Sequence, residues 1–307
     1  VDILIDYGYL YLRGNPTMGQ SVEEVKTLML GEIENLKKGN FDDGLLTSII
    51  NNAKKAMMQQ NEKYDNRAYA LMSVFTSEDD WKDNVTYTER LSKITKADVV
   101  AFANKYFGNN YVAVYKRKGE DKSITKVPKP PITAVETNRD AQSQFLRIVD
   151  KMPVADVKPV WLDYNKDITR STVGPAEVLY VHNAENDLFR MSYRYRTGTW
   201  NDKKMAVAAQ YLQFLGTDKM SAEEISREFY KLACSFSIKA DNEYTTVSLE
   251  GLQENFDKAA LLLEDLLTNL HFHENSNGEQ DEIALEGFRE ALRALVMSES
   301  IVGARVV

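Results

Sequence analysis

The chain has 307 residues, of which 43% are hydrophobic, and it carries a formal net charge of −8. This length is enough for about two domains, each with its own core. The negative charge argues against a nucleic-acid partner, which would require a basic surface. No apolar run approaches the roughly 18 residues that a membrane span needs. The single cysteine, Cys234, excludes an intramolecular disulfide and is expected to pack as a small core residue.

The first 118 residues are predicted to form a strand followed by helices and a closing strand. Alternating apolar residues predict a strand over 1–12. A capping box at 21–24 begins a helix that Gly39 ends. Further helices are expected from about residue 42, over 66–75 and after Thr95, each with its apolar face in a core, and Tyr111 to Tyr115 predict a buried strand.

The composition changes between residues 119 and 166. Pro128, Pro130 and Pro131 cannot continue the interior of a sheet, and Pro153 and Pro159 follow with little periodicity. Because this stretch is longer than most connections within a domain, we predict that it is an interdomain linker.

From about residue 167 the pattern predicts paired strands over 177–181 and 189–197. In the strand over 189–197, apolar residues alternate with a polar set that includes Arg190, Arg194 and Arg196. Two interpretations remain open for these arginines. They are solvated on the face opposite a helix-covered core, or they line a peptide chamber in which guanidinium groups meet carbonyl oxygens or acidic side chains.

Residues 200–227 have the arrangement of a metal-binding helix without the metal ligands. Val207, Gln210 and Tyr211 stand at i, i+3 and i+4 on one helical face, the spacing that an H-x-x-E-H metallopeptidase uses for two zinc-binding histidines and a glutamate. Valine has no donor atom, a tyrosine phenol with a pKa near ~10 is a poor ligand, and a glutamine amide cannot accept a proton from water. These positions are therefore expected to have no catalytic role and to bind no metal.

A second group of potential ligands is His271 and His273 with Glu274 and Glu279. These residues lie in a polar loop that follows a long amphipathic helix. We therefore interpret them as exposed loop residues and not as metal ligands. On a helix expected over 280–298, Glu282 and Glu286 are interpreted as ordinary helix-face carboxylates.

The motifs around the altered helix resemble the M16 (insulinase/pitrilysin-type) zinc metallopeptidase family. Gly198-Thr199 precedes the helix, residues 214–217 (FLGT) close it, residues 221–225 (SAEEI) begin the next helix, and residues 254–256 (ENF) precede an apolar helix. Residues 232–236 and 245–250 resemble the strand pair of the same domain. Residues 94–119 are similar to the segment that closes an M16 domain. The resemblance implies an α+β fold of M16 metallopeptidase-like domains, with antiparallel sheets and helices packed mainly on one face.

The resemblance further implies an internal fragment of a larger protein. Residues 1–118 would be the C-terminal part of one M16-like domain, 119–166 the linker, and 167–307 the N-terminal part of a second, non-catalytic domain with a degenerate H-x-x-E-H motif. The parent protein would be a zinc-dependent endopeptidase in which this segment forms the non-catalytic wall of the substrate chamber. The alternative is a scaffold or binding protein built from degenerate M16 domains.

The partners implied by the resemblance are peptide substrates and a catalytic half, either on the same chain or as a separate subunit. Zinc would be bound by the parent protein and not by this segment. Neither a nucleic-acid partner nor a membrane span is expected. The compartment, cytoplasm or periplasm, stays open.

Overall fold

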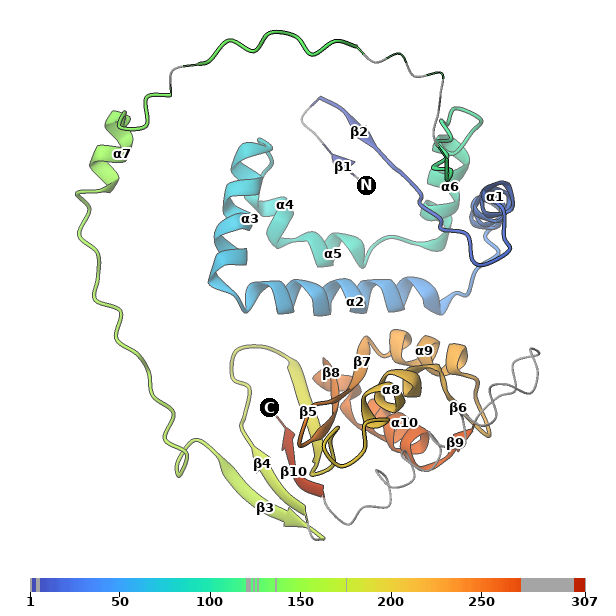
Figure 1. Cartoon of the computed structure of the whole chain (residues 1–307), viewed down its shortest axis with the longest axis vertical. Helices are drawn as coiled ribbons and strands as arrows, with labels where there is room; N and C mark the ends of the chain where they lie inside the picture. Colours follow the sequence, from blue (N-terminus) through green and yellow to red (C-terminus); the bar gives the residue numbers. More distant parts are fainter. Residues whose placement is uncertain are drawn as a thin grey trace. The chain divides into compact units, whose positions relative to one another are not determined.

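The computed structural model describes residues 2–3, 6–119, 123, 125, 127–135, 137–174, 176–271 and 301–306. They divide into two compact units, one formed by residues up to 110 together with those from 164 onward, and the other by residues 111–163. Within the second unit the chain follows an extended path with one short helix, α7 (Gln144–Val149) (Figure 1). The sequence pattern did not predict α7, whose first turn is capped by the Ser143 hydroxyl.

The N-terminal part of the larger unit is mainly helical. It begins with a short antiparallel hairpin of β1 (Asp2–Ile3) and β2 (Gly8–Tyr9). The single strand expected over 1–12 is therefore wrong, because the chain turns back between residues 3 and 8. The helices that follow are α1 (Val22–Lys38), α2 (Gly44–Asn61), α3 (Tyr64–Thr76), α4 (Trp81–Val85), α5 (Tyr87–Leu91) and α6 (Lys96–Tyr106).

Local hydrogen bonding explains where α1 and α6 begin and where α1 ends. The Ser21 hydroxyl accepts from the backbone N–H of Glu24, whose carboxylate accepts in return from the backbone N–H of Ser21. Thr95 and Asp98 form the same reciprocal pair before α6. Gly39 ends α1 in the left-handed region, with φ of 71°, which glycine adopts without a Cβ clash. These predicted helix boundaries are confirmed.

The apolar faces of the N-terminal helices were expected to be buried in a core, but several of their side chains are exposed. Leu28 is 61% exposed, Phe75 83% and Phe102 52%. The buried strand expected over 111–115 is also wrong, because no described strand pairs with this stretch, and Val112 and Val114 are about nine-tenths exposed. Sequence periodicity identifies which face of an element is apolar, but not whether another layer covers it.

The C-terminal part of the larger unit contains a six-stranded sheet with the order β3-β4-β10-β5-β8-β7. All neighbouring strands are antiparallel except β4 and β10, which are parallel. The strands are β3 (Thr169–Val173), β4 (Ala176–Tyr180), β5 (Leu188–Tyr195), β7 (Cys234–Ala240), β8 (Thr245–Leu252) and β10 (Ile301–Val306). The predicted pairing of the strands over 232–236 and 245–250 is confirmed as β7 with β8.

The expected direct pairing of the strands over 177–181 and 189–197 is wrong. These strands are β4 and β5, and β10 lies between them and pairs with both. Side-chain alternation identifies a strand and its two faces, whereas its neighbours in the sheet depend on distant segments of the chain.

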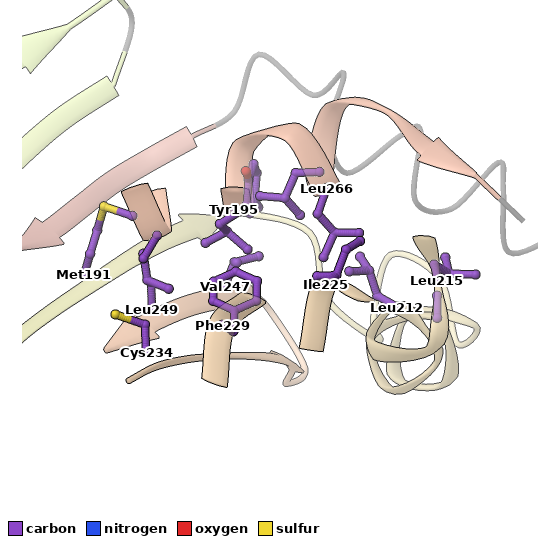
Figure 2. Close-up of a cluster of buried hydrophobic side chains, with 14 of the residues drawn as sticks. Met191, Tyr195, Leu212, Leu215, Ile225, Phe229, Cys234, Val247, Leu249 and Leu266 are labelled. Atoms are coloured by element: carbon purple, nitrogen blue, oxygen red, sulfur yellow. The ribbon is translucent and has the colours of Figure 1, made fainter. Parts of the chain in front are cut away.

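One face of this sheet carries the main core. The helices packed there are α8 (Met205–Tyr211), η1 (Leu212–Phe214), α9 (Ala222–Lys231) and α10 (Phe256–Thr268), the last preceded by η2 (Gln253–Asn255). From the sheet, Met191, Tyr195, Val247 and Leu249 point into the cluster (Figure 2). A second, two-stranded sheet joins β6 (Gly216–Thr217) to β9 (Leu270–His271). The α+β class with helices mainly on one face is therefore confirmed.

We expect Gly251→Ala to destabilise this sheet. Gly251 pairs with Cys234, and a Cβ there would overlap the Cys234 sulfur and lie 2.9 Å from the Ala233 carbonyl oxygen. The free energy of unfolding, measured by urea denaturation, should fall by about 1–3 kcal/mol. The control is Gly31→Ala in α1, where the new Cβ meets nothing within 4 Å and helix propensity improves. Equal effects of the two changes would contradict the packing described here.

Candidate functional site

Helix α8 has one face in the core and the other outside it. Met205, Ala208 and Leu212, at the start of η1, are at most 1% exposed. Val207 is 52% exposed, Gln210 is exposed and Tyr211 is half-buried. The structure thus places the three altered motif positions on α8, with Val207 and Gln210 exposed and Tyr211 packed partly against the core.

The turn before α8 is fixed by contacts with the loop between β7 and β8. The backbone N–H of Thr199 donates to the Asp241 carbonyl oxygen at 2.8 Å, and that of Trp200 donates to the Asn242 carbonyl oxygen at 2.9 Å. A Cβ at Gly198 would lie 2.6 Å from backbone atoms of Asp241 and Asn242. This close approach explains why glycine stands at 198.

The segment after α8 is also held by structural contacts. Leu215 and Thr217 are buried, and the Thr217 hydroxyl accepts from the backbone N–H groups of Lys219 and Met220, both at 3.2 Å. Ser221 and Glu224 then form the predicted capping box of α9. Residues around the altered motif therefore have structural functions that do not depend on a metal.

The donor set on α8 does not fit zinc. Throughout the described ranges, no group of three or more His, Cys, Asp or Glu side chains is placed to hold a metal ion. The backbone of His271 pairs with that of Gly216 in the β6–β9 sheet. His273, Glu274, Glu279, Glu282 and Glu286 lie outside the described residues.

Cys234 has the environment of a structural thiol. It is 4% exposed and belongs to the core cluster, as expected from the sequence. Burial raises the pKa of its thiol to about 11, so the thiol is neutral at physiological pH. A buried neutral thiol is a poor nucleophile.

The polar face of β5 gives its arginines different surroundings. Arg190 donates to Glu62 at 2.6 Å, and its Nε lies 3.8 Å from a carboxylate oxygen of Glu250. The Arg194 guanidinium lies 3.9 Å from the centre of the Tyr244 ring, a cation–π contact. Arg196 follows the last residue of β5, is exposed, and makes no hydrogen bond or ion pair with the described residues.

The sequence analysis did not identify the partners of Arg190. Glu250 lies directly opposite Arg190 in the β5–β8 register, so knowledge of this strand pair would have indicated it. Glu62 is separated from Arg190 by 128 residues, a distance over which no local pattern operates.

Ser192 and Ser248 lie between these charged groups, and their hydroxyls are 3.1 Å apart across β5 and β8. The exposed side of these strands therefore carries hydroxyl and guanidinium groups, while the opposite side is apolar. Such groups can hydrogen-bond an extended polar ligand.

A cavity of about 560 Å³ lies among the N-terminal helices, away from α8. Small apolar side chains of α2 line it, together with three aspartates and Arg90. Arg90 is 3.5 Å from Asp83, so part of the acidic charge is neutralised within the cavity. The lining residues are Ala53, Ala56, Met57, Gln60, Val74, Asp79, Asp80, Asp83, Asn84, Tyr87 and Arg90.

Comparison with family models identifies the segment that contains α8. Residues 205–299 match the model described as Insulinase (Peptidase family M16). This segment belongs to the M16 peptidase family. The matched M16 segment begins at Met205, the first residue of α8, so Val207, Gln210 and Tyr211 lie near its start. No curated protein matches the chain.

Three solved structures show partial similarity. A peptidase M16 inactive domain from Pseudomonas fluorescens has 20% identity and a TM-score of 0.32 over 40% of this chain and 30% of that chain. A protease from Helicobacter pylori has 16% identity and a TM-score of 0.32 over 41% of this chain and 31% of that chain. The periplasmic protease PqqL from Escherichia coli has 13% identity and a TM-score of 0.40, with 93% of this chain and 39% of that chain covered.

The chain thus spans less than two-fifths of the length of each of these structures. Because the similarity in structure is partial, the M16 assignment rests on the sequence match over residues 205–299. In the described part of the chain, no helix is long and apolar enough to cross a membrane.

We expect that the variant Val207→His, Gln210→Glu, Tyr211→His does not become a peptidase. Val207 and Gln210 are exposed, so replacing them should leave the fold intact, whereas the Tyr211 ring lies 6.3 Å from that of Phe214 and its loss should cost about 1–3 kcal/mol. A zinc site also needs a third ligand and groups that orient the imidazoles.

Zinc titration and a fluorogenic peptide assay would check this expectation. We predict weak zinc binding and no cleavage. Zinc-dependent cleavage that disappears when Gln is returned at position 210 would show that the site is latent, and the expectation would be wrong.

Proposed function

We propose that this chain belongs to a zinc-dependent endopeptidase and forms the non-catalytic wall of its substrate chamber. The proposal is carried by one observation: an M16 segment begins with a helix whose i, i+3 and i+4 motif positions are Val207, Gln210 and Tyr211. These side chains cannot bind zinc or activate water, so the chain itself performs no step of hydrolysis. Zinc, and the water that it activates, belong to a catalytic half.

That catalytic half is on the same chain or on a separate subunit. We propose the following domain boundaries on the same interpretation of the chain as part of an M16 peptidase. Residues 1–118 end one M16-like domain, 119–166 link the two domains, and 167–307 begin the non-catalytic domain. Peptides are the proposed substrates.

The exposed side of β5 and β8 is the proposed contact surface for peptides. Arg194 and Arg196 are both exposed, and guanidinium groups donate to carbonyl oxygens and carboxylates. The hydroxyls of Ser192 and Ser248 lie on the same side of the sheet. Arg190 is the least available of the three arginines because Glu62 and Glu250 surround it.

We expect the double variant Arg194→Glu, Arg196→Glu to weaken substrate binding in the full-length protein, or in this chain combined with its catalytic subunit. For an acidic peptide, KM should rise roughly fivefold to tenfold while kcat changes little, because the wall binds substrate without touching the reacting bond. The matched control is Arg227→Glu on α9, an exposed arginine that pairs only locally with Glu223.

Steady-state kinetics with acidic and basic peptides would separate the possible outcomes. An equal effect of the control variant would contradict the proposed contact surface. Absence of any zinc-dependent cleavage by the full-length protein would instead favour the alternative, a scaffold or binding protein built from degenerate M16 domains.

A further inference from the structure

Helix α2 contacts the C-terminal part of the larger unit through one side. Asn52 donates its side-chain amide to the Tyr230 carbonyl oxygen, at the end of α9, at 2.7 Å. Gln59 donates to the Glu250 carboxylate at 3.2 Å. Because Asn52 and Gln59 are seven residues apart, they lie on the same side of the helix.

Just beyond the last turn of α2, Glu62 adds a charged contact to this surface. Its carboxylate accepts from Arg190 at 2.6 Å and from the Asn186 amide at 3.1 Å. The hydrogen bond from Arg190, the largest effect on this group, lowers the pKa of Glu62. The two charged side chains remain partly open to solvent, 27% for Glu62 and 44% for Arg190.

Met58 supplies the apolar contact of this surface. It packs against a small buried cluster of Leu188, Ala233 and Leu252, which is separate from the main core. The contact surface therefore combines one apolar side chain with several polar pairs. Intrachain interfaces of this polar type resemble transient protein–protein interfaces more than they resemble a domain core.

From this combination we infer that the α2-docking surface holds the N-terminal helices in place without help from residues 111–163. We define this surface as the ends of β5, β8 and α9 that contact Asn52, Met58, Gln59 and Glu62. Its partner is α2 of the same chain, recognised by hydrogen bonds, one ion pair and the Met58 side chain. Because the pair between Glu62 and Arg190 is partly exposed, salt weakens the association.

The test is to cut the connecting segment and ask whether the two pieces stay together. A recognition site for a sequence-specific protease is inserted between Pro131 and Ile132, where Ile132 is 76% exposed. After cleavage, the pieces should co-elute in size-exclusion chromatography at about 0.1 M salt. Dilution followed by sedimentation analysis then gives their dissociation constant.

Glu62→Gln keeps the shape of the side chain and removes its charge. It should raise the dissociation constant of the cleaved pieces roughly twofold to fivefold at low salt. This difference should shrink at about 1 M salt, where ion pairs are screened. The matched control is Glu89→Gln on α5, which removes the same charge from an exposed position of the same piece and should change nothing.

Three results would overturn the inference. The cleaved pieces of the unaltered chain could separate at low salt, which would show that the linker holds them. Glu62→Gln and Glu89→Gln could have equal effects, or the dissociation constant could be independent of salt. Either of the last two results would show that the polar contacts of α2 do not determine the association.

Discussion

The structure around the altered motif depends on the burial of one face of α8. A helix of seven residues has too few internal hydrogen bonds to persist by itself, so packing must hold it. Met205, Ala208 and Leu212 provide that packing against the sheet, where Val247 and Leu249 are almost completely buried. The core therefore fixes the position of α8 without using Val207 or Gln210, which are exposed, while Tyr211 packs partly against the core.

This separation explains how an M16 segment can keep its architecture without metal-binding side chains. Gly198 allows a close backbone contact, Thr217 orders the turn after the helix, and Ser221 caps α9. None of these functions requires zinc. The motif residues that support the fold are present, whereas the positions that would perform the chemistry carry side chains without suitable donors.

Several elements could be predicted from the sequence because their causes are local. The reciprocal hydrogen bonds of Ser21 with Glu24 require only a three-residue spacing, and the alternation in β5 and β8 follows from the period of a strand. The position of β10 between β4 and β5 had no local signal, because its pairing joins segments more than a hundred residues apart. The same limit applies to the site: the sequence indicated that the altered motif positions share one helix, but not that Glu62 contacts Arg190.

Comparing the two faces of α8 by urea denaturation tests the central claim most directly. We predict that Leu212→Ala lowers the free energy of unfolding by about 2–5 kcal/mol, because it opens a cavity in the core. Gln210→Ala should change it by less than about 0.5 kcal/mol, because this side chain is exposed. A loss for Gln210→Ala as large as that for Leu212→Ala would contradict the claim that the core holds α8 without this altered motif position.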